Sequence, residues 1–326
     1  MSTFPGYALH CVPQILRGTR VRITDAAHLG LMLSALALTY LVPFELLLLA
    51  YVVLGPAHYA TEISWLHDRK YFLPRRGIAL GLAAVALVAA IIDDATWFGL
   101  VMWVAFVACA LMVAATALQA MVLFIAAIGL TAFMLTTGSL GVLGILLPTL
   151  IHVSLFTLVF MALGALRSGQ RVQWVLIAVY LAAIALILLV PPTAAMLVPA
   201  FAKAANEYFA LVAPALGRLF GIPGVTLDNR IVSLLAFVYT YHYLNWFIKA
   251  EVIRWADISR ERLALVTFAS AASTALYFYD YAYGFSVLLA FSLAHIVLEF
   301  PLNSMALRQL AEAIRRSSAK TTRQRA

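Results

Sequence analysis

The chain has 326 residues, of which 64% are hydrophobic and 11% are charged, and its formal net charge at pH 7 is +8. This composition excludes a soluble globular domain and indicates an integral membrane protein. A basic rim that lies against anionic lipid headgroups accounts for the positive charge. We therefore expect the lipid bilayer as a partner and no nucleic acid.

Apolar runs long enough to cross a bilayer follow one another along the chain, separated by short breaks that contain charged residues, glycine or proline. They predict an all-α fold, a polytopic transmembrane helix bundle of about ten spans within a single helical membrane domain over residues 1–326. The predicted spans are 24–42, 44–66, 77–93, 96–115, 118–136, 141–165, 172–190, 230–249, 263–281 and 285–305.

The predicted membrane bundle covers residues 23–306. Its longest break, 191–229, carries Pro191-Pro192 and an apolar stretch, which predicts an extracytoplasmic loop with an interfacial helix. Residues 307–326 are rich in arginine and are expected to form a basic cytoplasmic tail.

Arginine and lysine residues gather in every second break between the spans. If both termini are cytoplasmic, every cluster falls on the cytoplasmic side, as the positive-inside bias requires. We therefore predict a multi-pass protein of the cell inner membrane with cytoplasmic N- and C-termini. The clusters are Arg17, Arg20 and Arg22; Arg69, Lys70, Arg75 and Arg76; Arg167 and Arg171; Lys249, Arg254, Arg260 and Arg262; and the arginines of the tail.

Four histidines lie inside the predicted spans: His58, His152, His242 and His295. Their spans all run from outside to inside, and each histidine precedes the first cytoplasmic charge by roughly 7 to 15 residues, which places it between the middle of the bilayer and the inner leaflet. Ionisable side chains are costly in hydrocarbon unless they face a bundle interior and have partners. We predict that the four imidazoles bind one metal ion.

Two glutamates share a helix face with two of these histidines. Glu62 follows His58 by four residues, and Glu299 follows His295 by four. Each carboxylate could accept the second ring N–H of its histidine or bind the metal directly. Two negative charges would also offset those of a divalent cation in a medium of low dielectric.

Other residues near the histidines favour a cavity. Pro56, Pro148 and Pro301 lie close to three of the four motifs, and irregular backbone at membrane depth is tolerated where it lines a cavity. Asn245 lies on the face of His242 and is expected to stand behind the metal ligands, with direct ligation as the alternative.

The remaining histidines have an interfacial explanation. His10 and His28 flank the start of the first span, and His67 belongs to a charged run, so we expect all three to be solvated or at the headgroups. Lys249 and Arg254, at the cytoplasmic end of the eighth span, are expected to extend their charges to the interface in the same way.

Each of the four intramembrane histidines belongs to a longer motif. The motifs are Gly55-Pro56-Ala57-His58-Tyr59-Ala60-Thr61-Glu62, Leu150-Ile151-His152, Tyr241-His242-Tyr243 and Ala294-His295-Ile296-Val297-Leu298-Glu299-Phe300-Pro301. In this order they resemble the four histidine motifs of the bacterial and archaeal membrane β-carotene dioxygenases of the Brp/Blh type. The chain has glutamate where the family's first and last motifs end in aspartate, and Trp246 stands where the third motif carries a second histidine.

This resemblance implies a non-haem iron held by histidines and a symmetrical cleavage of β-carotene with O₂ that gives retinal. We accordingly expect a membrane-embedded iron oxygenase, a carotenoid-cleaving dioxygenase in kind, that takes a lipophilic substrate and O₂ from the bilayer. Fe(II) is the expected cofactor, with another transition metal as the alternative. Trp246, Tyr59 and Phe156 are expected to line the substrate pocket.

Two other functions fit the same residues. A proton- or metal-coupled membrane transporter would also place histidine and glutamate near the midplane beside broken helices. A di-iron lipid hydroxylase or desaturase would use Glu62 and Glu299 as metal ligands.

Overall fold

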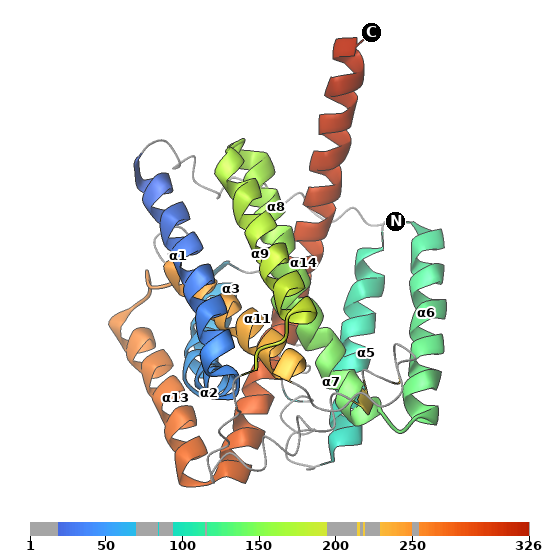
Figure 1. The fold of residues 1–326 in the computed structure, drawn as a ribbon. Helices are drawn as coiled ribbons and strands as arrows, with labels where there is room; N and C mark the ends of the chain where they lie inside the picture. Colours follow the sequence, from blue (N-terminus) through green and yellow to red (C-terminus); the bar gives the residue numbers. More distant parts are fainter. Residues whose placement is uncertain are drawn as a thin grey trace.

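The structure, a computed structural model, describes residues 19–69, 84, 94–114, 116–193, 214–215, 218, 229–249 and 254–325. These residues form helices joined by short connections, and none of them belongs to a strand (Figure 1). The predicted all-α class is therefore confirmed. Nearly all of the predicted span 77–93 and of the predicted loop 191–229 lies outside the described residues.

Two of the helical rods contain a π-helical turn. The elements are α1 (Thr19–Leu41), α2 (Pro43–Leu49), η1 (Ala50–Leu54), α3 (Gly55–Arg69), α5 (Ala95–Val113), α6 (Ala117–Thr136), α7 (Leu140–Leu150), η2 (Ile151–Phe156), α8 (Thr157–Ser168), α9 (Arg171–Leu189), α11 (Asn229–Ile248), α13 (Arg260–Tyr279) and α14 (Tyr281–Arg325). The π-helical turns η1 and η2 continue directly into the helices on either side of them.

Six of the described helical segments are long and apolar enough to cross a membrane, and each overlaps a predicted span. They are Pro43–Asp68, Ala117–Thr136, Leu140–Ser168, Arg171–Leu189, Arg230–Ile248 and Tyr283–Phe300. Two further predicted spans, 24–42 and 96–115, correspond to the shorter apolar stretches Asp25–Leu41 and Thr96–Ala108. The lengths and composition of these helices are compatible with a multi-pass membrane protein.

Local sequence explains where several helices begin and end. Asp94 caps α5, because its carboxylate accepts hydrogen bonds from the backbone N–H groups of Thr96 and Trp97 at 2.8 and 3.2 Å. Thr116 caps α6 in the same way. Gly169, with a φ of 67°, ends α8 in the left-handed conformation that glycine adopts without strain.

Proline explains the irregular backbone ahead of His58. Pro56 has no N–H, so the carbonyl of Val52, four residues earlier, lacks its α-helical donor. The hydroxyl of Thr274 on α13 donates to this carbonyl at 2.9 Å. Helix α13 therefore satisfies and fixes the broken rod that carries His58.

Two glycines fix the rod that carries His152, because they let α5 and α7 cross closely. A Cβ atom on Gly144 would lie 2.4 Å from the carbonyl oxygen of Gly99, and a Cβ atom on Gly99 would lie 2.3 Å from that of Leu140. Pro148 follows Gly144 by one turn, and His152 follows within η2. Single π-helical turns are frequent at functional sites.

Helix α11 runs through the middle of the bundle and packs against α1, α2, α3 and α9 (Figure 1). Its side chains Val232, Phe237, Val238 and Tyr241 are completely buried. Helix α6, in contrast, lies at the rim beside α5 and directs most of its apolar side chains outward. The bundle is therefore organised around α11, which carries His242.

One end of the bundle collects exposed arginines. Helix α8 ends, α9 begins and α14 finishes at this end (Figure 1). Arg167 of α8 donates to Gln309 of α14 at 2.5 Å, which joins two of these segments. The opposite end, where α5 and α14 begin, carries Asp94 and Asp280.

Candidate metal centre

Four helical elements bring one histidine each to the same place: His58 on α3, His152 in η2, His242 on α11 and His295 on α14. The ring centroids lie 4.8 Å apart for His58 and His242 and 4.9 Å apart for His242 and His152. They lie 5.0 Å apart for His152 and His295 and 5.3 Å apart for His295 and His58. The four imidazoles thus form a closed ring of neighbours inside the bundle.

Two pairs of neighbouring histidines in this ring direct their Nε2 atoms toward each other. The Nε2 atoms of His58 and His242 lie 3.2 Å apart, and so do the Nε2 atoms of His152 and His295. Two nitrogens that bind one metal ion at about 2.0–2.1 Å are separated by about 3.0–3.4 Å, depending on the angle between them. Both observed separations fall in that interval.

The two glutamates contact different kinds of ring nitrogen. Oε2 of Glu62 lies 2.9 Å from Nε2 of His58, the nitrogen that faces the cluster. Oε2 of Glu299 lies 2.9 Å from Nδ1 of His152, the nitrogen that faces away from His295. The sequence pairs Glu299 with His295 on its own helix, but the ion-pair contact of Glu299 is with His152, because η2 packs close to α14.

Thr157 sets the tautomer of His242. Its Oγ1 lies 3.1 Å from Nδ1 of His242 and also donates to the carbonyl of Val153 at 2.8 Å. Because the single O–H is directed at the carbonyl, the hydroxyl accepts the proton on Nδ1. The lone pair of His242 Nε2 is then free to bind a metal.

The cluster holds polar atoms that the described protein groups leave unsatisfied. Nδ1 of His58, Nδ1 of His295 and the Oε2 atoms of both glutamates are buried without an aligned hydrogen-bond partner. A carboxylate oxygen of Glu62, one of Glu299 and a nitrogen of His295 lie within 4.8 Å of one another. Buried anions are costly without a counter-charge. This buried His/Glu cluster fits a metal cation and could hold one.

Aromatic side chains cover the cluster. Tyr59 stacks on His295 with ring centroids 4.3 Å apart, and its hydroxyl shares a 2.5 Å hydrogen bond with that of Tyr243. Trp246 donates from Nε1 to Oγ1 of Thr61 at 2.9 Å. These buried rings exclude water from one side of the cluster.

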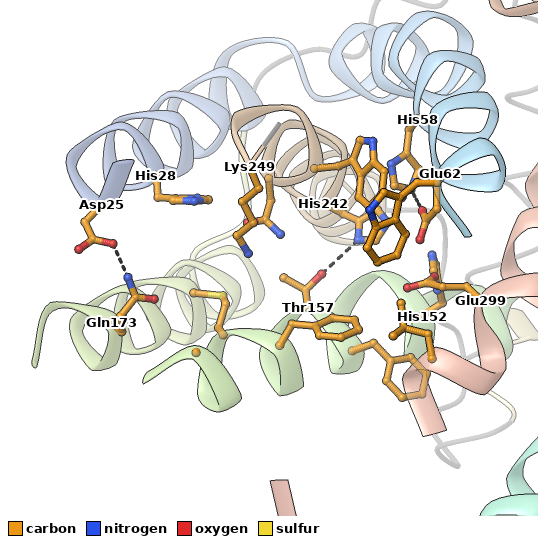
Figure 2. A pocket seen from close by; sticks show the side chains of 18 of the residues that line it. Asp25, His28, His58, Glu62, His152, Thr157, Gln173, His242, Lys249 and Glu299 are labelled. Carbon is orange, nitrogen blue, oxygen red and sulfur yellow. Dashed lines mark hydrogen bonds and ion pairs between the residues drawn. The ribbon is translucent and has the colours of Figure 1, made fainter. Parts of the chain in front are cut away.

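A cavity of about 360 Å³ leads away from the cluster. One end is lined by His58, His152, His242, Glu62 and Glu299, as Figure 2 shows. Phe156, Trp246 and Asn245 line the cavity as well. Tyr59 is not among the residues that line this cavity, since its ring lies fully buried against His295, and its expected place at the substrate stays a prediction.

Two residues assigned to the headgroup region belong to the cavity instead. His28 is only 4% exposed and lines the cavity together with Lys249 (Figure 2). Helix α1 packs against α11, which directs His28 into the bundle. Arg254 and His67 are exposed, as expected. His10 lies outside the described residues.

Helical periodicity in the sequence could have predicted that Lys249 lies on the same side of its helix as His242. His242, Asn245 and Lys249 are spaced by three and then four residues, which places them on one face of α11 and its continuation. No such local signal exists for Thr157, because its partner His242 is 85 positions away in the chain.

Comparison of the chain with protein-family models, with curated proteins and with solved structures gives no match. The cluster and the cavity are therefore the basis for assigning a function.

Proposed function

We propose that the protein is a membrane-embedded non-haem iron oxygenase that acts on a lipophilic substrate. The observation that carries this proposal is the meeting of four imidazoles from four separate elements, with two pairs of Nε2 atoms 3.2 Å apart. A structural metal site is closed by its own ligands, whereas a catalytic site keeps access for a substrate. The cavity that reaches this cluster provides such access.

The protein groups have distinct roles in this proposal. The residues that hold Fe(II), or another transition metal, are His58, His152, His242 and His295. When bound, the metal supplies the activation of O₂. Glu62 stands among the ligands and offsets the charge of the metal ion, while Glu299 orients His152 from behind and Thr157 orients His242. Trp246 and Phe156 form the wall against which the substrate lies.

The specific reaction proposed is the cleavage of a carotenoid double bond, on the strength of the resemblance of the four motifs. The central carbon–carbon double bond of β-carotene breaks, and one atom of O₂ becomes the aldehyde oxygen of each of two retinal molecules. This reaction consumes no other reductant. Substrate and O₂ both reach the site from the bilayer.

The proposal includes a bundle of about ten spans with both termini on the cytoplasmic side of the cell inner membrane. The exposed arginines at the end where α8 and α14 finish support this orientation, because cytoplasmic loops carry an excess of Arg and Lys. The cavity then opens from the cluster toward the cytoplasmic half of the membrane.

Metal analysis of the detergent-purified protein tests the proposal. We expect near-stoichiometric iron in the unaltered chain and its loss in His58→Ala and His295→Ala. The matched control is His67→Ala, since His67 is an exposed histidine on the same helix as His58 and outside the cluster. Full iron content in the two cluster variants would end the proposal.

Pigment loss tests the substrate. Expression in a bacterium that makes β-carotene should bleach the cells and produce retinal, and the His58→Ala variant should do neither. Unchanged pigment with an iron-loaded protein would remove β-carotene and leave another lipophilic substrate.

One observation favours the di-iron alternative. Two groups of three residues share His295 and could each hold an ion, namely His58, His152 and His295, and Glu62, His295 and Glu299, whereas His242 belongs to neither group. A second metal ion in the carboxylate-rich group would make a lipid hydroxylase or desaturase. Two irons per chain in the metal analysis identify this case, and a chain without bound iron favours the proton- or metal-coupled transporter.

A further inference from the structure

The cavity has a polar end opposite the metal cluster. Asp25, His28, Gln173 and Lys249 line it there, as Figure 2 shows. Asp25 accepts a hydrogen bond from Gln173. Lys249, in contrast, forms no hydrogen bond or ion pair with the described residues, and Nδ1 of His28 is buried without a hydrogen-bond partner. Among the described residues, the polar end thus offers a cation and a buried ring nitrogen that both lack a partner.

Lys249 immediately follows the last residue of α11, so the helix sets its distance from the cluster. It follows His242 by seven residues, which is two turns on the same face and about 10 Å along the helix axis. Asn245 lies between them and also lines the cavity, with its Oδ1 buried and unpartnered. A molecule held at Lys249 therefore reaches the cluster only through a spacer of several carbon–carbon bonds.

The stretch between the two ends is mainly apolar, with Asn245 and Thr157 as its polar side chains. Phe156, Phe160, Met161, Trp65 and Trp246 contribute its walls. These side chains suit a hydrocarbon chain and offer little to a second polar group. An ammonium at the end of such a stretch is costly without an anion, and an anion that binds there offsets this cost.

We propose that the cavity binds an amphiphile with an anionic end, which pairs with Lys249 while its unsaturated hydrocarbon part lies at the metal cluster. This inference rests on the proposed oxygenase for the role of the cluster, and it replaces the carotenoid hydrocarbon with an anionic amphiphile as the class of substrate. Lys249 is a positioning residue, because it fixes which carbon atoms lie at the metal. A hydrocarbon such as β-carotene has no group for Lys249, whereas a long-chain carboxylate or a lipid phosphate does.

Binding of a brominated fatty acid tests the proposal. Dibromostearate with bromine at the middle of its chain quenches tryptophan on contact, and Trp65 and Trp246 line the apolar stretch. With the iron-loaded protein in nanodiscs, we expect saturable quenching that oleate reverses and methyl oleate does not. Oleoyl lysophosphatidate presents a phosphate on the same chain, so the tighter competitor identifies the head group.

The Lys249→Met variant should raise the half-saturating concentration of dibromostearate by roughly tenfold or more, because a hydrogen bond to a charged group is lost. Lys249→Arg should keep binding close to that of the unaltered chain. Arg254→Met is the control, since Arg254 is an exposed cation that pairs with Asp257 outside the cavity. Equal competition by oleate and methyl oleate, or unchanged binding in Lys249→Met, would overturn the proposal.

Iron content separates this proposal from the proposed function. Lys249→Met should retain the iron of the unaltered chain, because Lys249 is not among the cluster residues. A chain that binds dibromostearate through Lys249 but no iron would overturn the oxygenase and leave the anion site in place. An iron-loaded chain that binds oleate and methyl oleate equally would overturn the anion site and leave the oxygenase in place.

Discussion

Glu62 and Glu299 approach their histidines from different sides, so their removal should have different consequences. Glu62 lies 2.9 Å from the cluster-facing nitrogen of His58, where it can share the metal. Glu299 lies 2.9 Å from the outward Nδ1 of His152, where it acts through the ring. We expect Glu299→Gln to weaken metal binding by about 10- to 100-fold, as for other carboxylates behind a ligand, and Glu62→Gln to weaken it more.

Competition between the purified variants and a chelator of known affinity measures this difference. Glu45→Gln is the control, because Glu45 is a half-buried carboxylate on α2 that belongs to neither metal-binding group. A larger loss in Glu299→Gln than in Glu62→Gln would show that the assignment of the two roles is reversed.

Glu62 and Glu299 also show which side-chain contacts could be predicted from the sequence. A spacing of four residues predicted the contact between His58 and Glu62, which the structure contains because both lie on one turn of α3. The same spacing on α14 suggested His295 as the partner of Glu299. The contact with His152 depends on how α14 and η2 are rotated against each other, and that rotation leaves no mark in the local sequence.

At the scale of elements, the close crossing of α5 and α7 supports the position of His152. A Cβ atom on Gly144 would lie 2.4 Å from the backbone of Gly99, so the helices must separate in Gly144→Ala. We expect this variant to lose about 1–3 kcal/mol of stability, as overpacked cores do, and to lower the midpoint of thermal unfolding.

Gly129→Ala on α6 is the matched control for this prediction. Nothing lies within 4 Å of a Cβ atom built at Gly129, so the change removes only backbone freedom from an exposed helical position. It should be neutral or stabilise the helix by about 0.5–1 kcal/mol. Equal unfolding midpoints for Gly144→Ala and the unaltered chain would show that the crossing tolerates a side chain.

The irregular backbone of the helices that carry His58 and His152 could be predicted in part from the sequence. Pro56 and Pro148 predicted breaks near His58 and His152, because proline lacks the N–H that a helix needs. The sequence could not show that the break ahead of His58 is stabilised by Thr274. That donor comes from α13, more than two hundred residues further along the chain.

At the scale of the whole molecule, hydropathy predicted the class of fold and most of its long helices. Six of the described helices meet the length and apolar content of a membrane span, whereas α13 does not, since its first turn carries Arg260, Glu261 and Arg262. The sequence also predicted how deep the four histidines lie in the bilayer, because their distance along the chain from the first cytoplasmic charge can be counted. The burial of His28 could not be read in this way, because it depends on α1 packing against α11.

Helix α14 makes the proposed orientation testable with two positions on one element. Tyr283 lies at its beginning and is 71% exposed, and Arg316 lies near its far end and is exposed too. Their separation of 33 positions corresponds to about 50 Å of helix, which exceeds the hydrocarbon thickness of about 30 Å. The two side chains should therefore lie on opposite sides of the membrane.

Single cysteines at these positions, in a chain whose Cys11 and Cys109 are replaced by serine, report their sides to a maleimide that cannot cross membranes. We expect Tyr283→Cys to react in intact cells and Arg316→Cys to react only after the membrane is opened, because the arginines of the tail favour the cytoplasmic side. The opposite labelling pattern would show that the bundle has the inverse orientation, with the cavity opening toward the outside. Reaction of both positions in intact cells would show that α14 does not cross the membrane.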